Sequence, residues 1–221
     1  MPGIRRRALI DLDAFLHNGP GEVLDARADA YGHGLEVIAP TALKADVRQI
    51  VVSNEQDATV AIAAGFRREA VHIAREPLVA DPRAYGLGHD GRPVMSLIGE
   101  IVALKRVPPD AGVSYGYTYR TSVATTLALV ALGYADGVPR LASNRVRVLV
   151  GDATFPLVGR IAMDQFVLDV GDAAIELGSD AVLFGDPARG EPSVLEWSGW
   201  TERDPLALTA GIASRVVRSA R

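Results

Sequence analysis

The chain has 221 residues, of which 48% are hydrophobic and 23% charged, and its formal net charge is −4. These values are ordinary for a globular protein and give no sign of a nucleic-acid partner. The absence of cysteine excludes disulfides, thiolate metal ligands and cysteine nucleophiles. No uncharged apolar stretch reaches the roughly 18 residues of a membrane span, and no cleavable leader is recognised, so we expect a cytoplasmic protein.

The first third of the chain alternates between strand and helix patterns. After a first strand at 8–12, the sequence predicts strands at 22–26, 47–53 and 69–74 and helices at 35–43 and 54–64. The helix at 54–64 has a capping residue, Ser53 or Asn54, and ends at Gly65. Residues 28–34 are small and polar and predict a loop. The alternation predicts parallel βα units.

Prolines and glycines gather between residues 75 and 93, which predicts a domain boundary there. Beyond it the chain is rich in strands, predicted at 94–107, 122–132, 145–150, 155–170 and 180–184, with final helices at 193–198 and 206–217. We therefore expect two domains. Residues 1–88 form an α/β unit whose first strand can join the second domain, and residues 92–221 form a β domain.

Five segments carry distinctive motifs. They are residues 10–14 (IDLDA) with Asn18, 27–34 (RADAYGHG), 113–116 (VSYG) with Thr118 and Tyr119, 133–137 (GYADG) with Pro139 and Arg140, and 159–165 (GRIAMDQ); Ser214, Arg215, Val216 and Arg218 form a weaker sixth. In this order they resemble the alanine racemase family, whose members depend on pyridoxal phosphate. Each motif is weak alone, but five in the family's order are specific.

The resemblance implies an N-terminal (β/α)8 barrel and a C-terminal β domain, paired head to tail in a dimer. Each active site of the family combines one subunit's barrel with the other subunit's β domain. A complete barrel takes about 250 residues, whereas only about three βα units fit before residue 75. We therefore expect a truncated, incomplete (β/α) barrel followed by the alanine-racemase-type C-terminal β domain.

The family's Schiff-base lysine is replaced by Arg27 in this sequence. A guanidinium keeps its proton, with a pKa above about 12, so it serves neither as an amine nucleophile nor as a base. Two interpretations of Arg27 stay open: it contacts an anion, or it ends a strand and faces solvent. The two lysines, Lys44 and Lys105, fall near a helix end and in a β-domain strand. Neither is expected at the carboxyl end of a barrel strand, where a substitute amine would be needed.

Four other positions match functional residues of the family. They are Tyr115 (the second catalytic base), Tyr31 (a contact to the cofactor phosphate), Met163 (whose backbone N–H holds the substrate carboxylate) and Tyr134 (at the active-site entrance). Each also has an ordinary interpretation as a packed aromatic or core residue. His33 is interpreted as a hydrogen-bonded loop histidine, because four scattered histidines give no metal-binding spacing.

These departures favour a degenerate racemase, a pseudoenzyme with little or no activity, in which covalent pyridoxal phosphate is not expected. The family reaction is the interconversion of L- and D-alanine, which supplies D-alanine for peptidoglycan. The alternative is a regulatory or binding partner that dimerises with a full-length racemase. An enzyme of another kind ranks last, because a dismantled barrel offers no obvious deep pocket. We expect a homodimer or such a heterodimer, and no nucleic-acid, membrane or metal partner.

A short parallel sheet has a further consequence. Three strands leave two open edges and apolar faces that a closed barrel does not have. The β domain, a second copy or a partner must then cover them.

Overall fold

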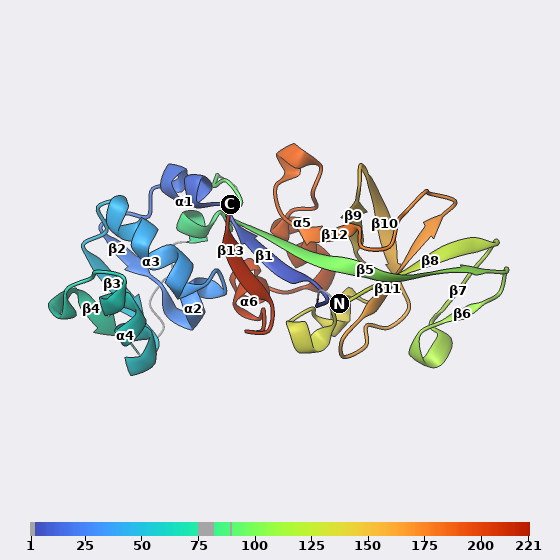
Figure 1. Cartoon of the computed structure of the whole chain (residues 1–221), viewed down its shortest axis with the longest axis horizontal. Coiled ribbons are helices and arrows are strands. Elements are labelled where there is room, and N and C mark those ends of the chain that lie inside the picture. Colours follow the sequence, from blue (N-terminus) through green and yellow to red (C-terminus); the bar gives the residue numbers. More distant parts are fainter. Residues whose placement is uncertain (1–2, 75–81, 89) are drawn as a thin grey trace.

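The computed structural model describes residues 3–74, 82–88 and 90–221 and arranges them in two regions (Figure 1). An α/β unit lies at one end of the molecule and an antiparallel β barrel at the other. Strands β1 and β13 and the beginning of β5 lie between them. The boundary predicted between residues 75 and 93 falls partly outside the described residues.

The α/β unit contains a three-stranded parallel sheet in the order β2-β3-β4. Its elements are α1 (Leu12–Asn18), β2 (Val23–Asp25), α2 (Arg27–Tyr31), α3 (Leu35–Lys44), β3 (Gln49–Val52), α4 (Glu55–Ala63), η1 (Arg68–Ala70), β4 (Val71–Ile73) and η2 (Pro82–Tyr85). The side chain of Asn54 caps α4 by accepting a hydrogen bond from Asp57 N. The predicted alternation of strand and helix is confirmed, with shorter strands than expected.

Residues 28–34, predicted as a loop, begin as a helical turn of the opposite hand. Ala28, Asp29, Ala30 and Tyr31 all have positive φ, between 50° and 58°. Such a conformation costs L-residues roughly 1–2 kcal/mol each. Hydrogen bonds hold the turn in place: Ala28 N donates to Ser53 Oγ (2.8 Å), and Asp29 Oδ1 accepts from Leu35 N (2.7 Å).

The β domain closes on itself. Six strands pair in the order β12-β9-β10-β11-β8-β5, and β5 pairs again with β12, while β1 and β13 extend the sheet from β5. The strands are β1 (Arg6–Ile10), β5 (Met95–Val107), β6 (Gly112–Val113), β7 (Tyr119–Arg120), β8 (Thr125–Val130), β9 (Arg147–Val150), β10 (Ala153–Val158), β11 (Phe166–Gly171), β12 (Asp180–Phe184) and β13 (Val217–Ala220). Short helices η3 (Tyr115–Tyr117), η4 (Tyr134–Asp136), η5 (Arg140–Ala142), η6 (Pro187–Arg189), α5 (Val194–Thr201) and α6 (Pro205–Ala210) connect them.

Two sequence predictions were wrong in this domain. Residues 155–170 are not one strand but the antiparallel strands β10 and β11, because the chain turns at Gly159, whose φ is +75°. The helix predicted at 206–217 ends at Ala210, and β13 follows, paired in parallel with β1. The small hairpin β6–β7 was not predicted either.

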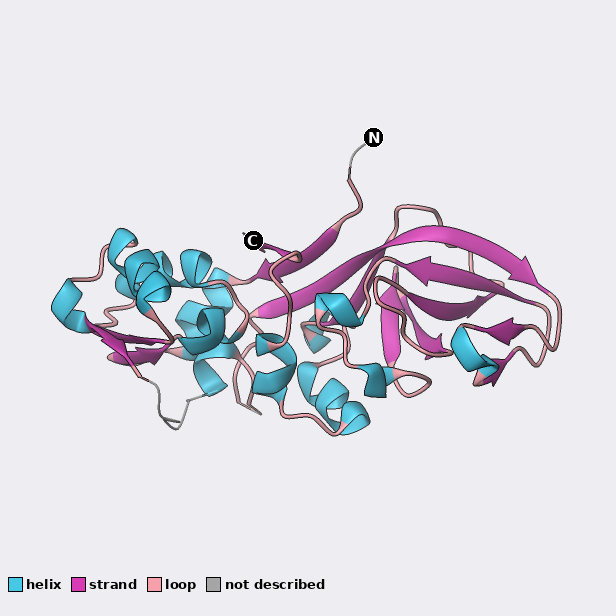
Figure 2. Ribbon diagram, turned by 90° about the horizontal axis from the view of Figure 1, so that it is seen from below, coloured by secondary structure: helices cyan, strands magenta, loops and turns pink. Residues whose placement is uncertain are grey.

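The two regions are joined by packing and by one arginine. Helix α2 packs against α6, and α3 against β13. Arg218 of β13 donates to the carbonyl of Gly32, at the end of α2, and to those of Ile212, Ala213 and Val216. Figure 2 shows the long β5 crossing from the junction into the barrel. Within the described ranges, no helix is long and apolar enough to cross a membrane.

Candidate functional site

Position 27 lies directly beyond the carboxyl end of β2, and its side chain turns back onto that strand. Arg27 Nε donates to Asp25 Oδ1 (2.9 Å) and Arg27 Nη2 to Asp25 Oδ2 (2.6 Å). This is the two-point geometry in which a guanidinium binds a carboxylate best. The side chains are 16% and 12% exposed, respectively, for Arg27 and Asp25, so the ion pair is largely withdrawn from solvent.

Two tyrosines complete this cluster. The hydroxyl of Tyr31 donates to Asp25 Oδ2 (2.9 Å) and accepts from Arg27 Nη2 (3.3 Å). The hydroxyl of Tyr85 donates to the backbone carbonyl of Asp25 (2.6 Å), and its ring contacts those of Tyr31 and His33. We call Asp25, Arg27 and Tyr31 the Asp25 cluster. Its polar groups bond chiefly to one another at the end of β2.

The electrostatics of the Asp25 cluster favour the ion pair. Burial alone would raise the pKa of Asp25, but hydrogen bonds from Arg27 and Tyr31 outweigh it and lower that pKa. The hydrogen bond to Asp25 raises the pKa of Arg27 further. Burial, helped by the neighbouring carboxylate, raises the pKa of Tyr31. Asp25 is therefore ionised and Tyr31 neutral near pH 7.

Of the two open interpretations of Arg27, contact with an anion describes this arrangement. The side chain does not simply face solvent, and the anion that it contacts is a carboxylate of its own chain. Lys44 is the last residue of α3 and Lys105 lies within β5, so both lysines are where the sequence placed them. No described strand of the α/β sheet ends at either one.

In the β domain, Tyr115 lies on the exposed turn η3, between β6 and β7, and is 71% exposed. With Ser114, Ala162 and Gln165 it lines a cavity of about 380 Å³. The turn is fitted closely to the neighbouring loop, since a Cβ added to Gly159 would lie 2.9 Å from Ser114. Tyr115 is thus an accessible aromatic on a packed turn rather than a core residue.

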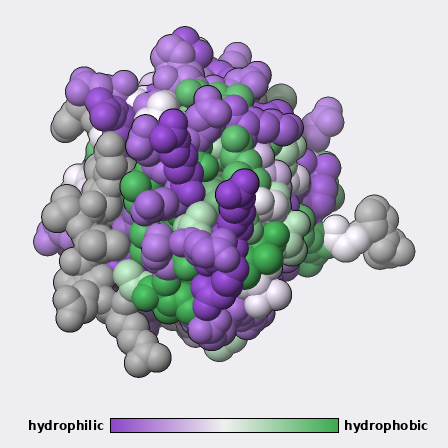
Figure 3. Space-filling view, turned by 90° about the vertical axis from the view of Figure 1, so that its left-hand side faces the viewer, coloured by the Kyte–Doolittle hydropathy of each residue, from purple (hydrophilic) through white to green (hydrophobic). Residues whose placement is uncertain are grey.

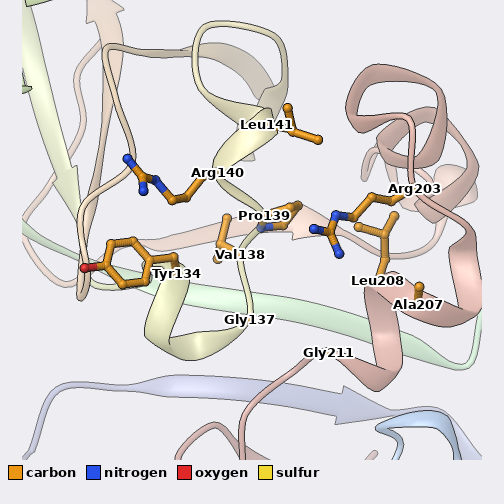
Figure 4. A pocket seen from close by; sticks show the side chains of 10 residues that line it. All are labelled: Tyr134, Gly137, Val138, Pro139, Arg140, Leu141, Arg203, Ala207, Leu208 and Gly211. Atoms are coloured by element: carbon orange, nitrogen blue, oxygen red, sulfur yellow. The ribbon is translucent and has the colours of Figure 1, made fainter.

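The loops that carry Tyr134 and Met163 are hydrogen-bonded to each other. Tyr134 N donates to Ala162 O (3.1 Å) and Ala135 N to Met163 O (2.9 Å). Tyr134 is 42% and Met163 53% exposed, so core packing does not account for Met163. Tyr134 also lies under Arg140, at the edge of a cavity of about 350 Å³ that reaches Arg203 (Figure 4).

A buried carboxylate fixes these two loops. Asp136 is fully buried and accepts from Gly133 N (2.7 Å) and from Arg215 Nε (2.7 Å), while Arg6 Nε lies 3.3 Å away. Arg215 also pairs with Asp164, in the Met163 loop, at 2.7 Å.

Sequence analysis assigned no role to Asp136 or to Asp25. For Asp25 a signal exists, because residues two apart at a strand end share one face and Asp25 and Arg27 have opposite charges.

Within one chain the Asp25 cluster and Tyr115 lie far apart. The Asp25 cluster is in the α/β unit, whereas the hairpin with Tyr115 is at the opposite end of the molecule (Figure 1). Tyr115, Tyr117, Val123, Tyr134 and Met163 are large exposed residues of the β domain, and Leu16, Val23 and Ile62 are exposed in the α/β unit. The end formed by the α/β unit shows apolar patches among hydrophilic residues (Figure 3). In the described ranges, no group of three His, Cys, Asp or Glu side chains could hold a metal ion.

Comparison with solved structures defines the class of fold. The alanine racemase from D-cycloserine-producing Streptomyces lavendulae has a TM-score of 0.86 at 23% identity, covering 100% of this chain and 98% of that one. The alanine racemase from Bartonella henselae, solved with covalently bound pyridoxal phosphate, has a TM-score of 0.80 at 17% identity, covering 100% of both. The chain therefore has the fold of the alanine racemases.

Sequence comparison identifies the family. The family described as "Alanine racemase, C-terminal domain" matches residues 94–220. The alanine racemase of Thermobifida fusca is 39% identical over 194 residues, which are 87% of this chain and 50% of that protein. The alanine racemase of Streptomyces coelicolor is 44% identical over 146 residues, which are 66% of this chain and 36% of that protein.

The chain belongs to the alanine racemase family, as its motifs predicted. It spans between a third and a half of the length of these curated relatives, 36% and 50% respectively.

Proposed function

We propose that this chain is a member of the alanine racemase family with little or no racemase activity of its own. The observation that carries the proposal is the Asp25 cluster, in which the position of the family's lysine holds a guanidinium bound at two points to Asp25. Capture of an aldehyde needs a neutral amine, and a guanidinium is not one. The hydroxyl of Tyr31, which matches a cofactor contact, is already bonded to Asp25. The residues present therefore do not fit covalent pyridoxal phosphate.

The α/β unit supports the same proposal. In the residues that the structure describes, its sheet has three parallel strands instead of a barrel's eight, which we interpret as a truncated (β/α) barrel within residues 1–88. The β domain, residues 92–221 together with strand β1, is the complete part. The family reaction, interconversion of L- and D-alanine, requires groups from both parts. Here the β domain has its matching residues Tyr115 and Met163, whereas the α/β unit has Arg27 in place of the lysine.

An absorbance scan with pyridoxal phosphate tests this proposal, before and after Arg27→Lys. We expect no saturable imine band for the natural chain, and none for the variant, because the walls of the barrel are missing as well as the amine. A saturable band in the natural chain, with exchange of L- and D-alanine above buffer, would overturn the proposal. A band in the variant alone would show that the pocket is intact and that only the amine is missing.

A second candidate function is partnership with a full-length racemase. It is favoured by the exposure of Tyr115, Met163 and Tyr134 on loops that the β domain already holds in place. In the family, these positions complete the active site of the other subunit, so the chain could lend them to a partner or block it. The simpler alternative is a homodimer in which two copies of this chain associate through the face that carries Tyr115, Met163 and Tyr134. A cytoplasmic location stays a prediction.

Sedimentation of the chain with and without an intact racemase distinguishes these states. Association at micromolar concentration, with a change in the racemase rate on mixing, supports the partner function. Tyr115→Ala is expected to change the rate in the mixture more than it changes the association. If the two proteins sediment independently at that concentration and the rate of the intact racemase does not change on mixing, the partner function is ruled out.

A further inference from the structure

We propose that Asp25 makes position 27 a fixed cationic position, so that a lysine placed there would be held as an ammonium ion rather than as a free amine. This inference rests on the proposed function. It identifies the carboxylate of Asp25 as a second feature, besides the missing lysine, that disfavours a reactive amine at position 27. It concerns Asp25, to which none of the motifs assigned a role.

The geometry gives Asp25 this role. Its two carboxylate oxygens each accept from Arg27, and Oδ2 also accepts from the hydroxyl of Tyr31. The backbone is held too, because Arg27 N donates to Asp25 Oδ1 (3.2 Å) and Tyr85 fixes the Asp25 carbonyl. A carboxylate with these donors is set in one orientation, toward position 27.

The surroundings make the ion pair effective. The two side chains are 16% and 12% exposed, so solvent screens their attraction less than at the surface. Among the described residues, Asp25 of β2 and Tyr31 of α2 are titratable groups that face the guanidinium. Tyr31 is neutral near pH 7, so of these two groups Asp25 is the one that favours a cation at position 27.

A lysine at position 27 would meet the same carboxylate. An opposite charge within about 4–6 Å favours the charged form of an ionisable group. An ammonium ion has no lone pair with which to attack a carbonyl, so the pairing suppresses nucleophilic reaction. Restoring the lysine alone therefore gives a smaller fraction of neutral amine than the same lysine would have without Asp25.

The test measures the pKa of a lysine introduced at position 27 directly and needs no cofactor. The chain is prepared as Arg27→Lys and as Arg27→Lys with Asp25→Asn. The lysines are reductively methylated with ¹³C and titrated by NMR. Lys44 and Lys105, both exposed, serve as internal references in every sample. We expect the pKa of the introduced lysine to lie above those of the references in the first variant and to fall by at least about one pH unit in the second.

A matched control separates Asp25 from charge in general. Glu22→Gln, in the Arg27→Lys background, removes an exposed carboxylate just before the same strand, and we expect it to leave the titration of the introduced lysine unchanged. Circular dichroism checks that each variant is folded. A second readout is labelling by an amine-reactive acetylating reagent at pH 8. There Asp25→Asn should raise the labelling rate at position 27 about tenfold relative to Lys44.

An equal pKa for the introduced lysine with and without Asp25 would overturn the inference, as would an equal shift on Glu22→Gln. These outcomes differ from failure of the proposed function, which would appear as an imine or racemase activity in the natural chain. If Asp25→Asn frees the amine but pyridoxal phosphate still does not bind, both statements hold, because the missing barrel walls then limit binding.

Discussion

In the β domain, each of the six barrel strands is hydrogen-bonded on both sides, because β5 pairs with β8 and with β12. In the described part of the α/β unit, only β3 has a strand on either side. The β domain can thus satisfy its backbone within one closed sheet, whereas the α/β unit ends in edges. The unit relies instead on short strands, the Asp25 cluster and the bonds of Arg218 to the β domain.

The comparison teaches where change is tolerated within one chain. The closed domain keeps its loops ordered around buried Asp136, so residues such as Tyr134 and Met163 stay in place without a neighbouring barrel. In the open unit, the position that matches a reactive amine has become part of the unit's internal bonding. The predictions below test each side of this contrast.

The largest effect is expected from Asp136→Ala in the closed domain. The change leaves Arg6 and Arg215 without their buried partner and removes the acceptor of Gly133 N. We expect a loss of about 4 kcal/mol in the free energy of unfolding, measured by urea denaturation. Asp164→Ala is the control, because it removes a half-exposed partner of the same Arg215 and should cost less than about 1 kcal/mol. Equal losses would contradict the importance of the buried network.

Acid is expected to weaken the α/β unit through His33. Burial lowers the pKa of His33 to about 4, whereas an unfolded histidine titrates near about 6.5. Between these two pKa values His33 is protonated in the unfolded state but not in the folded state. The free energy of unfolding therefore falls as the pH drops from 7 through about 6.5 toward 4. The expected loss is about 3 kcal/mol at pH 4.

Denaturation of His33→Gln measures this contribution, because its pH dependence over the same range should be shallower. His72→Gln, which changes an exposed histidine on β4, is the control and should keep the full dependence. If both variants follow the natural chain, His33 does not couple folding to pH.

The junction between the two regions is tested by Arg218→Ala. Four carbonyls lose a shared donor, and the packing of a half-buried side chain is lost with it. We expect the free energy of unfolding of the α/β unit to fall by about 2 kcal/mol. Amide hydrogen exchange should then become faster in β2 and β3, while the barrel strands keep their protection. Uniformly faster exchange in both regions would mean that they unfold as one unit. Arg106→Ala, an exposed arginine paired with Asp172, should change little.

The smallest effect concerns the left-handed turn. Ala28 is exposed and has a φ of +51°, so Ala28→Gly should relieve strain and stabilise the chain by about 1 kcal/mol. Ala63→Gly, at the exposed last residue of the right-handed α4, should destabilise the chain, by less than a glycine in a helix interior would. Thermal melts of the two variants should therefore shift in opposite directions.

Much of the fold could be predicted from the sequence where patterns are local. Strand β12 has the predicted bounds, and α4 begins at a residue with a capping side chain. The patterns failed where long-range contacts decide. The apolar runs on both sides of residues 159–165 predicted one continuous strand, but the chain turns from Gly159 onward, and β13 forms because β1 offers it an edge.

The candidate site was predictable by position but not by contact. The motifs located Arg27, Tyr31, Tyr115, Tyr134 and Met163, since short motifs survive in sequence. The partner of Arg27 was not identified. Whether the guanidinium contacts solvent, a bound anion or Asp25 depends on how these groups are placed in the folded chain. The exposure of Met163 was equally invisible, since a methionine in an apolar run is usually buried.

The most direct test of the central claim is deuterium exchange at the α-carbon of alanine. The natural chain, L-alanine and pyridoxal phosphate are incubated in D₂O, and the α-proton signal is followed by NMR against heat-unfolded chain. We predict the same slow loss of signal with folded and unfolded chain. A faster loss that grows in proportion to the concentration of folded chain would contradict the account.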